Sequence, residues 1–149
     1  MNGARVPLKI SLTRRYKFAA SHRLYSAQFS EEENKRLYGK CGNPYGHGHN
    51  YLVEVTVSGP VDPETGMVAN LGELDPFVER EVIEPFDQRY LNKEISEFHE
   101  IVPTTENICR EIYGRLKAFS AARIERVRIQ ETSNNSFEYR EEAELAQSC

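Results

Sequence analysis

The sequence predicts an α+β domain in which a four-stranded antiparallel sheet carries two helices on one face. Two segments with apolar residues at every second position come first, two with helical spacing follow, and two short alternating segments come last. This order ββααββ, with hairpin-like connections, is typical of an antiparallel sheet rather than of alternating βαβ units. The 149 residues fit one domain, residues 1–149, because compact domains commonly contain about 100 to 200 residues. Residues 1–8 and 141–149 are expected to be flexible ends.

The first two strands are predicted from period-two patterns. The apolar positions of the first strand are Ile10, Leu12, Tyr16, Phe18 and Ala20. Those of the second are Tyr51, Val53, Val55 and Val57, followed by Gly59-Pro60. Between the two strands, the acidic stretch from Ser30 to Lys40 is interpreted as a loop that contains one helical turn.

Two helices are predicted between the strand pairs. The first has Leu71, Leu74, Val78 and Val82 on one face and is expected to end at Pro85. Because proline suits the first turn of a helix, Asp75 is the expected cap, with Pro76 at the first helical position. The second helix follows Pro103, with Thr104 or Thr105 as its cap, and is expected to pack on the sheet. Its apolar stripe is Ile108, Ile112, Leu116 and Phe119.

The last two strands carry Val127 and Ile129, and Phe137 and Tyr139. The polar residues Ser133 to Ser136 between them predict a turn. Cys109 lies beside the apolar stripe of the second helix and is interpreted as a packing residue.

Composition argues against several classes of protein. Nineteen Lys and Arg against 23 Asp and Glu give a net charge of −4, so no overall positive field exists to hold nucleic acid or an anionic membrane. No stretch approaches the roughly 18 apolar residues of a membrane span, and the start of the chain does not resemble a signal peptide. We therefore expect a soluble cytoplasmic protein, without nucleic-acid or membrane partners. The odd number of cysteines does not indicate a disulfide framework.

Three of the four histidines lie at predicted strand ends. His22 continues the apolar face of the first strand, and His47 and His49 continue that of the second. Residues two apart in a strand point the same way, so His47 and His49 can present two imidazoles to one point, and His22 adds a third if the strands pair. Three imidazoles suit zinc and leave one position open for water or substrate. The alternative is a pair of ordinary loop histidines in a glycine-rich turn.

Other polar residues are candidates for chemistry. Cys41 lies in a polar stretch six residues before His47, and it is a base or nucleophile, a fourth zinc ligand, or a surface thiol. Glu131 follows Val127 and Ile129 on an inward face, where a carboxylate needs partners. It can accept the paired N–H groups of a pterin or guanine, or else face solvent or pair with a neighbouring arginine. Asp87 is a turn residue or an acid/base group.

These segments together resemble the 6-pyruvoyltetrahydropterin synthase family, over nearly the whole chain from about Arg15 to Tyr139. The stretches that carry the resemblance are Phe18-Ala19-Ala20-Ser21-His22-Arg23-Leu24, Gly39-Lys40-Cys41-Gly42-Asn43-Pro44-Tyr45-Gly46-His47-Gly48-His49-Asn50-Tyr51, Asp62-Pro63-Glu64-Thr65-Gly66-Met67-Val68, Thr104-Thr105-Glu106-Asn107, and Glu131-Thr132 before Asn134-Asn135.

The resemblance implies the tunnelling fold, in which trimers form an antiparallel barrel and two trimers stack into a homo-hexamer with active sites between subunits. It implies a lyase that removes triphosphate from 7,8-dihydroneopterin triphosphate to give 6-pyruvoyltetrahydropterin, with Zn²⁺ as cofactor. By matching position, His22, His47 and His49 bind zinc, Cys41 abstracts a proton, and Asp87 is a second catalytic group. Glu131 anchors the pterin ring, and Thr104, Thr105 and Glu106 line its pocket.

One residue departs from the family pattern. A histidine usually follows the aspartate that Asp87 matches and forms a relay with the cysteine, whereas here the next residue is Gln88. Glutamine holds hydrogen bonds but does not titrate near neutral pH. We expect a working enzyme in which Asp87 or water supplies the proton. His99 lies outside the matching positions.

Two alternatives stay open. One is 6-carboxytetrahydropterin synthase of the queuosine pathway, which shares the fold, zinc ligands and substrate but cleaves the side chain. The other is a non-catalytic pterin-binding zinc protein, which Gln88 and ligation by Cys41 would favour. Arg15, Lys17, Arg23 and Lys40 are candidates for phosphate contact, although solvated surface charge is the better explanation for each of them, and we do not assign them to the site.

Overall fold

Two long antiparallel strands form the centre of the sheet. The structure, a computed structural model, describes residues 9–141. Strand β1 (Ile10–His22) pairs residue by residue with β2 (His47–Gly59), which confirms the first two predicted strands. The last residue of β1 lies opposite the first residue of β2, so both strands present a histidine at this end of the sheet.

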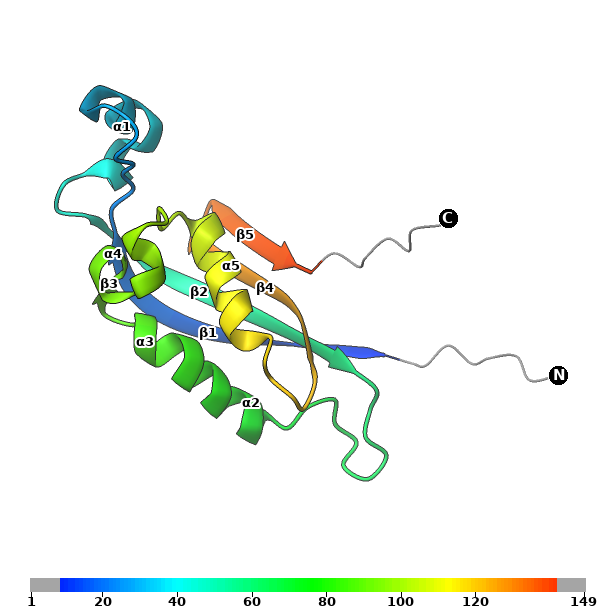
Figure 1. The fold of residues 1–149 in the computed structure, drawn as a ribbon. Coiled ribbons are helices and arrows are strands. Elements are labelled where there is room, and N and C mark those ends of the chain that lie inside the picture. Colours follow the sequence, from blue (N-terminus) through cyan, green and yellow to red (C-terminus); the bar gives the residue numbers. More distant parts are fainter. Residues whose placement is uncertain (1–8, 142–149) are drawn as a thin grey trace, which may run out of the picture.

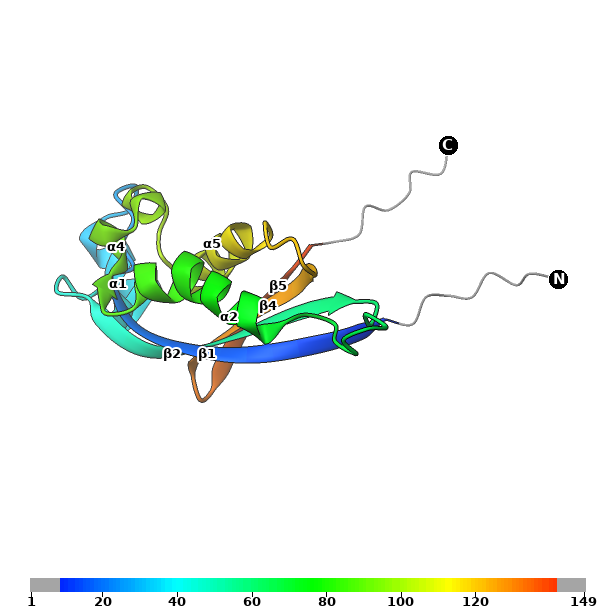
Figure 2. The same cartoon turned by 90° about the horizontal axis from the view of Figure 1, so that it is seen from below.

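The sheet continues beyond β2 through β4 (Arg123–Thr132) and β5 (Asn135–Arg140), which were also predicted. Figure 2 shows a curved sheet with the helices on its concave side. The convex face is polar, and there Glu54 accepts hydrogen bonds from Arg15 and Arg128. The α+β class is therefore correct, with the apolar side chains of the strands facing the helices.

The prediction of a purely antiparallel four-stranded sheet was wrong, because the sheet is mixed and has a fifth strand. Strand β3 (Arg89–Tyr90) pairs in parallel with β1 at Ala20 and Ser21, giving the order β3-β1-β2-β4-β5. The N–H of Gln88 donates to the carbonyl of Ala19 at 2.6 Å and places the chain beside β1. A strand of two residues has no periodicity that a sequence pattern can reveal.

The segment predicted as a loop with one helical turn is a helix. Helix α1 (Glu31–Tyr38) is followed by the 3₁₀ turn η1 (Gly39–Gly42). The hydroxyl of Ser30 accepts the N–H of Glu33 at 3.1 Å and caps the helix. Ser-x-x-Glu is the sequence pattern of a capping box, so this helix carried a signal that the acidic run obscured.

The first predicted helix begins earlier than expected. Helix α2 (Leu71–Val78) is capped by Asn70, which accepts the N–H of Gly72 at 2.8 Å, so Asp75 is not the cap. Pro76 lies inside the helix and removes one backbone hydrogen bond. Burial of the apolar face against the sheet outweighs that loss, which is why propensity alone misplaced the start.

Helical backbone then continues to Phe86 through a π segment, η2 (Glu79–Ile83), and one further turn, α3 (Glu84–Phe86). Pro85 cannot donate to the carbonyl of Glu81, and Arg115 donates to that carbonyl instead at 3.4 Å. The helix thus ends one residue after Pro85, close to the predicted position.

The remaining elements cover the histidine end and the middle of the sheet (Figure 1). Helix α4 (Leu91–Glu94) and η3 (Ser96–His99) were not predicted, whereas α5 (Thr105–Leu116) was, with Thr104 as its cap. The side chains that close the core between helices and sheet are Phe18, Tyr51, Val53, Val55, Leu74, Val78, Val82, Phe86, Ile108, Ile112, Leu116, Val127 and Ile129.

No helix in residues 9–141 is long and apolar enough to cross a membrane. Apart from Glu141, the ends predicted to be flexible, residues 1–8 and 141–149, lie outside the described residues.

Candidate metal and ligand site

The histidines gather at one end of β1 and β2, as their positions in the two strands predict. His22 pairs with His47, and Ala20 pairs with His49. The ring centroids of His22 and His49 are 5.0 Å apart, and those of His47 and His49 are 4.7 Å apart. His22 is fully buried, whereas His47 is exposed.

The imidazoles of His22 and His49 each have a free ring nitrogen that can bind a cation. The Nδ1 of His22 hydrogen-bonds the carbonyl oxygen of Pro103 at 2.8 Å, and because a carbonyl only accepts, this nitrogen carries the proton. The Nε2 atoms of both residues are buried without a hydrogen-bond partner among the described residues. Burial lowers the pKa of each ring and favours the neutral form that binds metals. Buried nitrogens without partners are consistent with a bound ion.

Cys41 is the third member of the group that the structure assembles. One ligand atom each from His22, Cys41 and His49 lies within 4.8 Å of the others, whereas the nitrogens of His47 are not part of this group. Cys41 is half-buried in η1, and its carbonyl accepts the N–H of Leu24 at 2.7 Å, which ties η1 to the end of β1. Burial, and then the charge of Glu131, raise the pKa of the Cys41 thiol.

A carboxylate borders the metal group. Glu131 of β4 accepts a hydrogen bond from the hydroxyl of Thr105, and its Oε1 is 4.0 Å from the Nε2 of His49. Thr105 is buried at the first position of α5, and Thr104 caps that helix by accepting the N–H of Asn107. Glu106 is exposed. The structure therefore brings Thr105 and Glu131 to the histidines and leaves Glu106 at the surface.

Asp87 and Gln88 follow α3 and lie beside β1, where both hydrogen-bond the backbone of Ala19. The carboxylate of Asp87 accepts the N–H of Ala19 at 2.9 Å, and within residues 9–141 no hydrogen bond joins it to Cys41. Gln88 adopts a left-handed φ of 60° and lines a pocket of about 480 Å³ at the edge of β1, together with Ser21, His49 and Asn50. His99, which no prediction placed in the site, is exposed and hydrogen-bonds the carbonyl of Lys93.

Tyr51 belongs to the site but was not among the predicted residues. Its ring stacks on Phe18 at 4.9 Å and meets the rings of His49 and His22 at 5.6 and 6.4 Å. The side chain is 1% exposed, and its hydroxyl has no hydrogen-bond partner among the described residues. Burial raises the pKa of Tyr51, as do the charges of Glu131 and Cys41. The signal was available, since Tyr51 follows His47 and His49 on the same strand face.

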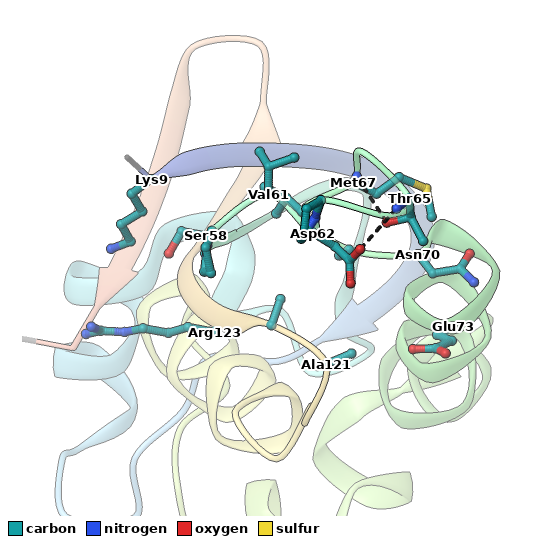
Figure 3. A pocket seen from close by; sticks show the side chains of 16 residues that line it. Lys9, Ser58, Val61, Asp62, Thr65, Met67, Asn70, Glu73, Ala121 and Arg123 are labelled. Carbon is teal, nitrogen blue, oxygen red and sulfur yellow. Dashed lines mark hydrogen bonds between the residues drawn. The ribbon is translucent and has the colours of Figure 1, made fainter. Parts of the chain in front are cut away.

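A separate pocket lies at the other end of β2. Figure 3 shows this cavity of about 990 Å³ between the loop after β2 and the start of β4. Its lining includes Ser58, Met67, Ala121 and Arg123. The carboxylate of Asp62 accepts the N–H groups of Glu64 and Thr65 and so holds the loop in its turn. No histidine lines it, so it is separate from the metal group.

The fold and the site define an α+β protein with a candidate metal centre beside a partly buried carboxylate. The chain belongs to the 6-pyruvoyl tetrahydropterin synthase family, whose family model matches residues 11–142.

Individual relatives agree with this assignment. The chain is 48% identical over 132 residues to 6-pyruvoyl tetrahydrobiopterin synthase of Poecilia reticulata, covering 88% of this chain and 90% of the relative. The structure of Caenorhabditis elegans 6-pyruvoyl tetrahydropterin synthase matches with a TM-score of 0.86 and 36% identity, covering 91% of this chain and 98% of the other. A putative 6-carboxy-5,6,7,8-tetrahydropterin synthase of Archaeoglobus fulgidus is 38% identical over 115 residues, covering 77% of this chain and 91% of the relative. The chain is therefore a lyase of the pterin-synthase type.

Proposed function

We propose that this chain converts 7,8-dihydroneopterin triphosphate to 6-pyruvoyltetrahydropterin, with loss of triphosphate, and that it requires zinc. The observation that carries the proposal is the pair of buried, unpartnered Nε2 atoms of His22 and His49, with Cys41 and Glu131 beside them. Nitrogen ligands suit zinc, and a carboxylate suits the N–H edge of a pterin.

Three imidazoles hold the zinc in this proposal: His22, His49 and the adjacent His47. His47 lies on the same strand face as His49, with its ring 4.7 Å away, and as an exposed side chain it is not tied down by packing. This arrangement leaves Cys41 free for proton transfer. Zinc bound there would supply Lewis acidity that makes the C–H bonds of the substrate side chain more acidic.

The other residues of the chain position the substrate and move its protons. Glu131 accepts the paired N–H groups of the pterin ring, and the hydroxyl of Thr105 holds the carboxylate in place. Thr104 and Glu106 complete the pocket from the start of α5. A ring held in this way presents its side chain to Cys41, whose thiolate takes the proton from carbon.

Asp87 returns a proton from a neighbouring copy of the chain in a tunnelling-fold homo-hexamer. Within one chain its carboxylate is engaged with Ala19 at the edge of β1 and is not joined to Cys41. A second subunit that places this edge against the metal group would bring the two together. Gln88 in the relay position lowers the supply of protons without abolishing it.

The test is incubation of the zinc-loaded protein with 7,8-dihydroneopterin triphosphate, following triphosphate release and the mass of the product. His49→Ala should abolish turnover, and His99→Ala, which alters an exposed histidine outside the site, should leave it unchanged. A 6-carboxy product would instead assign the second candidate, which the Archaeoglobus fulgidus relative favours. Pterin binding without turnover would assign the non-catalytic alternative and refute the proposal.

A further inference from the structure

Three of the four buried side-chain polar atoms that lack a partner in residues 9–141 belong to neighbouring rings, whose centroids are 5.0 to 6.4 Å apart. They are His22 Nε2, His49 Nε2 and the hydroxyl of Tyr51, whereas Ser58 Oγ lies at the far end of β2. A metal ion accounts for the two nitrogens, which offer lone pairs. It does not account for a protonated phenol, which needs an acceptor for its own hydrogen.

The hydroxyl of Tyr51 makes no hydrogen bond to any of the described residues. The ring makes the packing contacts, through its stack on Phe18 and its edge contacts with His22 and His49. Phenylalanine would make all of these contacts. A buried hydroxyl without a partner costs stability, because its hydrogen bonds with water are lost on folding and not replaced. We therefore expect the hydrogen-bond acceptor of this hydroxyl to be a group on a bound ligand.

The position of Tyr51 indicates where that acceptor lies. His49 is the neighbour of Tyr51 on the same face of β2. Glu131 lies on the adjacent strand β4, next to Gln130, which pairs with Leu52 of β2. A ligand whose ring is held by Glu131 and whose substituent extends to the histidines has to pass Tyr51. The ring of Tyr51 lies 5.6 Å from the ring of His49 and 6.4 Å from that of His22, so a ligand that reaches the metal group comes close to this side chain.

We propose that the phenol of Tyr51 is a ligand-binding hydrogen-bond donor, which donates to an oxygen on the side chain of the bound pterin. The inference rests on the proposed function in that the ligand is a pterin with an oxygen-bearing side chain. Tyr51 is thus a further substrate-positioning residue, besides the metal ligands, the thiol and the carboxylate.

The test compares Tyr51→Phe with Tyr16→Phe, a matched control whose hydroxyl donates to Asp75 at 2.7 Å. In metal-free protein, the urea midpoint of Tyr51→Phe should be equal to or above that of the wild type, whereas Tyr16→Phe should lower it. Binding of neopterin, followed by its fluorescence, should weaken about tenfold in Tyr51→Phe, because one hydrogen bond is lost, and should not change in Tyr16→Phe. Zinc affinity should be unchanged in both variants.

Either of two results overturns the inference. One is a fall in the urea midpoint of Tyr51→Phe as large as that of Tyr16→Phe, which would show that the hydroxyl has a partner within the fold. The other is unchanged neopterin binding. Because neopterin binding needs no turnover, wild-type protein that binds neopterin but releases no triphosphate would refute the proposed function and leave the inference on Tyr51 standing.

Discussion

Two inactive variants, Cys41→Ser and Asp87→Asn, should restore activity to each other when their subunits are mixed. Within one chain, Asp87 is held by the N–H of Ala19 at 2.9 Å, whereas Cys41 belongs to the metal group. Asparagine keeps an oxygen that accepts the Ala19 N–H, so the second variant should fold. If each site takes its thiol from one copy and its carboxylate from another, random mixing in equal amounts leaves both groups intact in about a quarter of the sites.

The assay is co-expression of the two variants with different tags, tandem purification of mixed assemblies, and measurement of triphosphate release. The expected activity is about a quarter of the wild-type value, while each variant alone should lose about 100-fold or more, as is typical of a lost acid or base. The matched control mixes Cys41→Ser with His49→Ala. These residues belong to the same group in one chain, so every site stays defective. The reasoning is refuted if the first mixture gains nothing, or if the control mixture recovers as well.

Three further predictions concern metal binding and stability. His47→Ala should weaken zinc binding by about 100-fold through loss of one ligand, whereas Cys41→Ser should leave it nearly unchanged, as measured by competition with a chelator. Hydrogen bonds from Arg14 lower the pKa of Asp75, so its stabilising effect is complete above its unfolded pKa of about 4 and is lost as pH falls through the lower folded pKa. Asp75→Asn should therefore flatten the loss of stability between pH 5 and about pH 2, measured by urea unfolding. Phe86→Ala should lower the free energy of unfolding by about 3 to 5 kcal/mol, because Phe86 is fully buried.

Each of these predictions has an outcome that contradicts it. Loss of zinc from Cys41→Ser, with binding retained in His47→Ala, would make the thiol the third ligand. If the free energy of unfolding falls as steeply below pH 5 in Asp75→Asn as in the wild type, another titrating group causes most of that fall. A loss below about 1 kcal/mol in Phe86→Ala would show that the neighbouring aromatic rings close over the cavity. Leu37→Ala, which alters an exposed side chain of α1, serves as the stability control.

The sequence was most informative where side-chain direction depends on local geometry alone. Alternation along β1 and β2 places every second residue on one face, which put His22, His47 and His49 together once the strands paired. The same alternation places Tyr51 on the face of His47 and His49. Tyr51 was not predicted as a site residue because an aromatic residue on an apolar strand face usually belongs to the hydrophobic core.

The contacts that could not be predicted join segments far apart in the chain. The bond from Thr105 to Glu131, the bond between His22 and Pro103, and the pairing of β3 with β1 all depend on how the helices dock on the sheet. The exposed position of His47 and the inclusion of Cys41 in the metal group depend on side-chain placement, which spacing does not specify.

Pro103 and Thr105 lie two residues apart, and each holds one half of the site. The carbonyl of Pro103 orients His22, and the hydroxyl of Thr105 orients Glu131. A shift of this short segment would move the proposed metal ligand and the proposed ring anchor together, so we infer that the two proposed binding events are thermodynamically linked. Such linkage is reciprocal: the factor by which bound metal tightens pterin binding is also the factor by which bound pterin tightens metal binding. The protein would then be most exposed to chelators between turnovers, when the pterin pocket is empty.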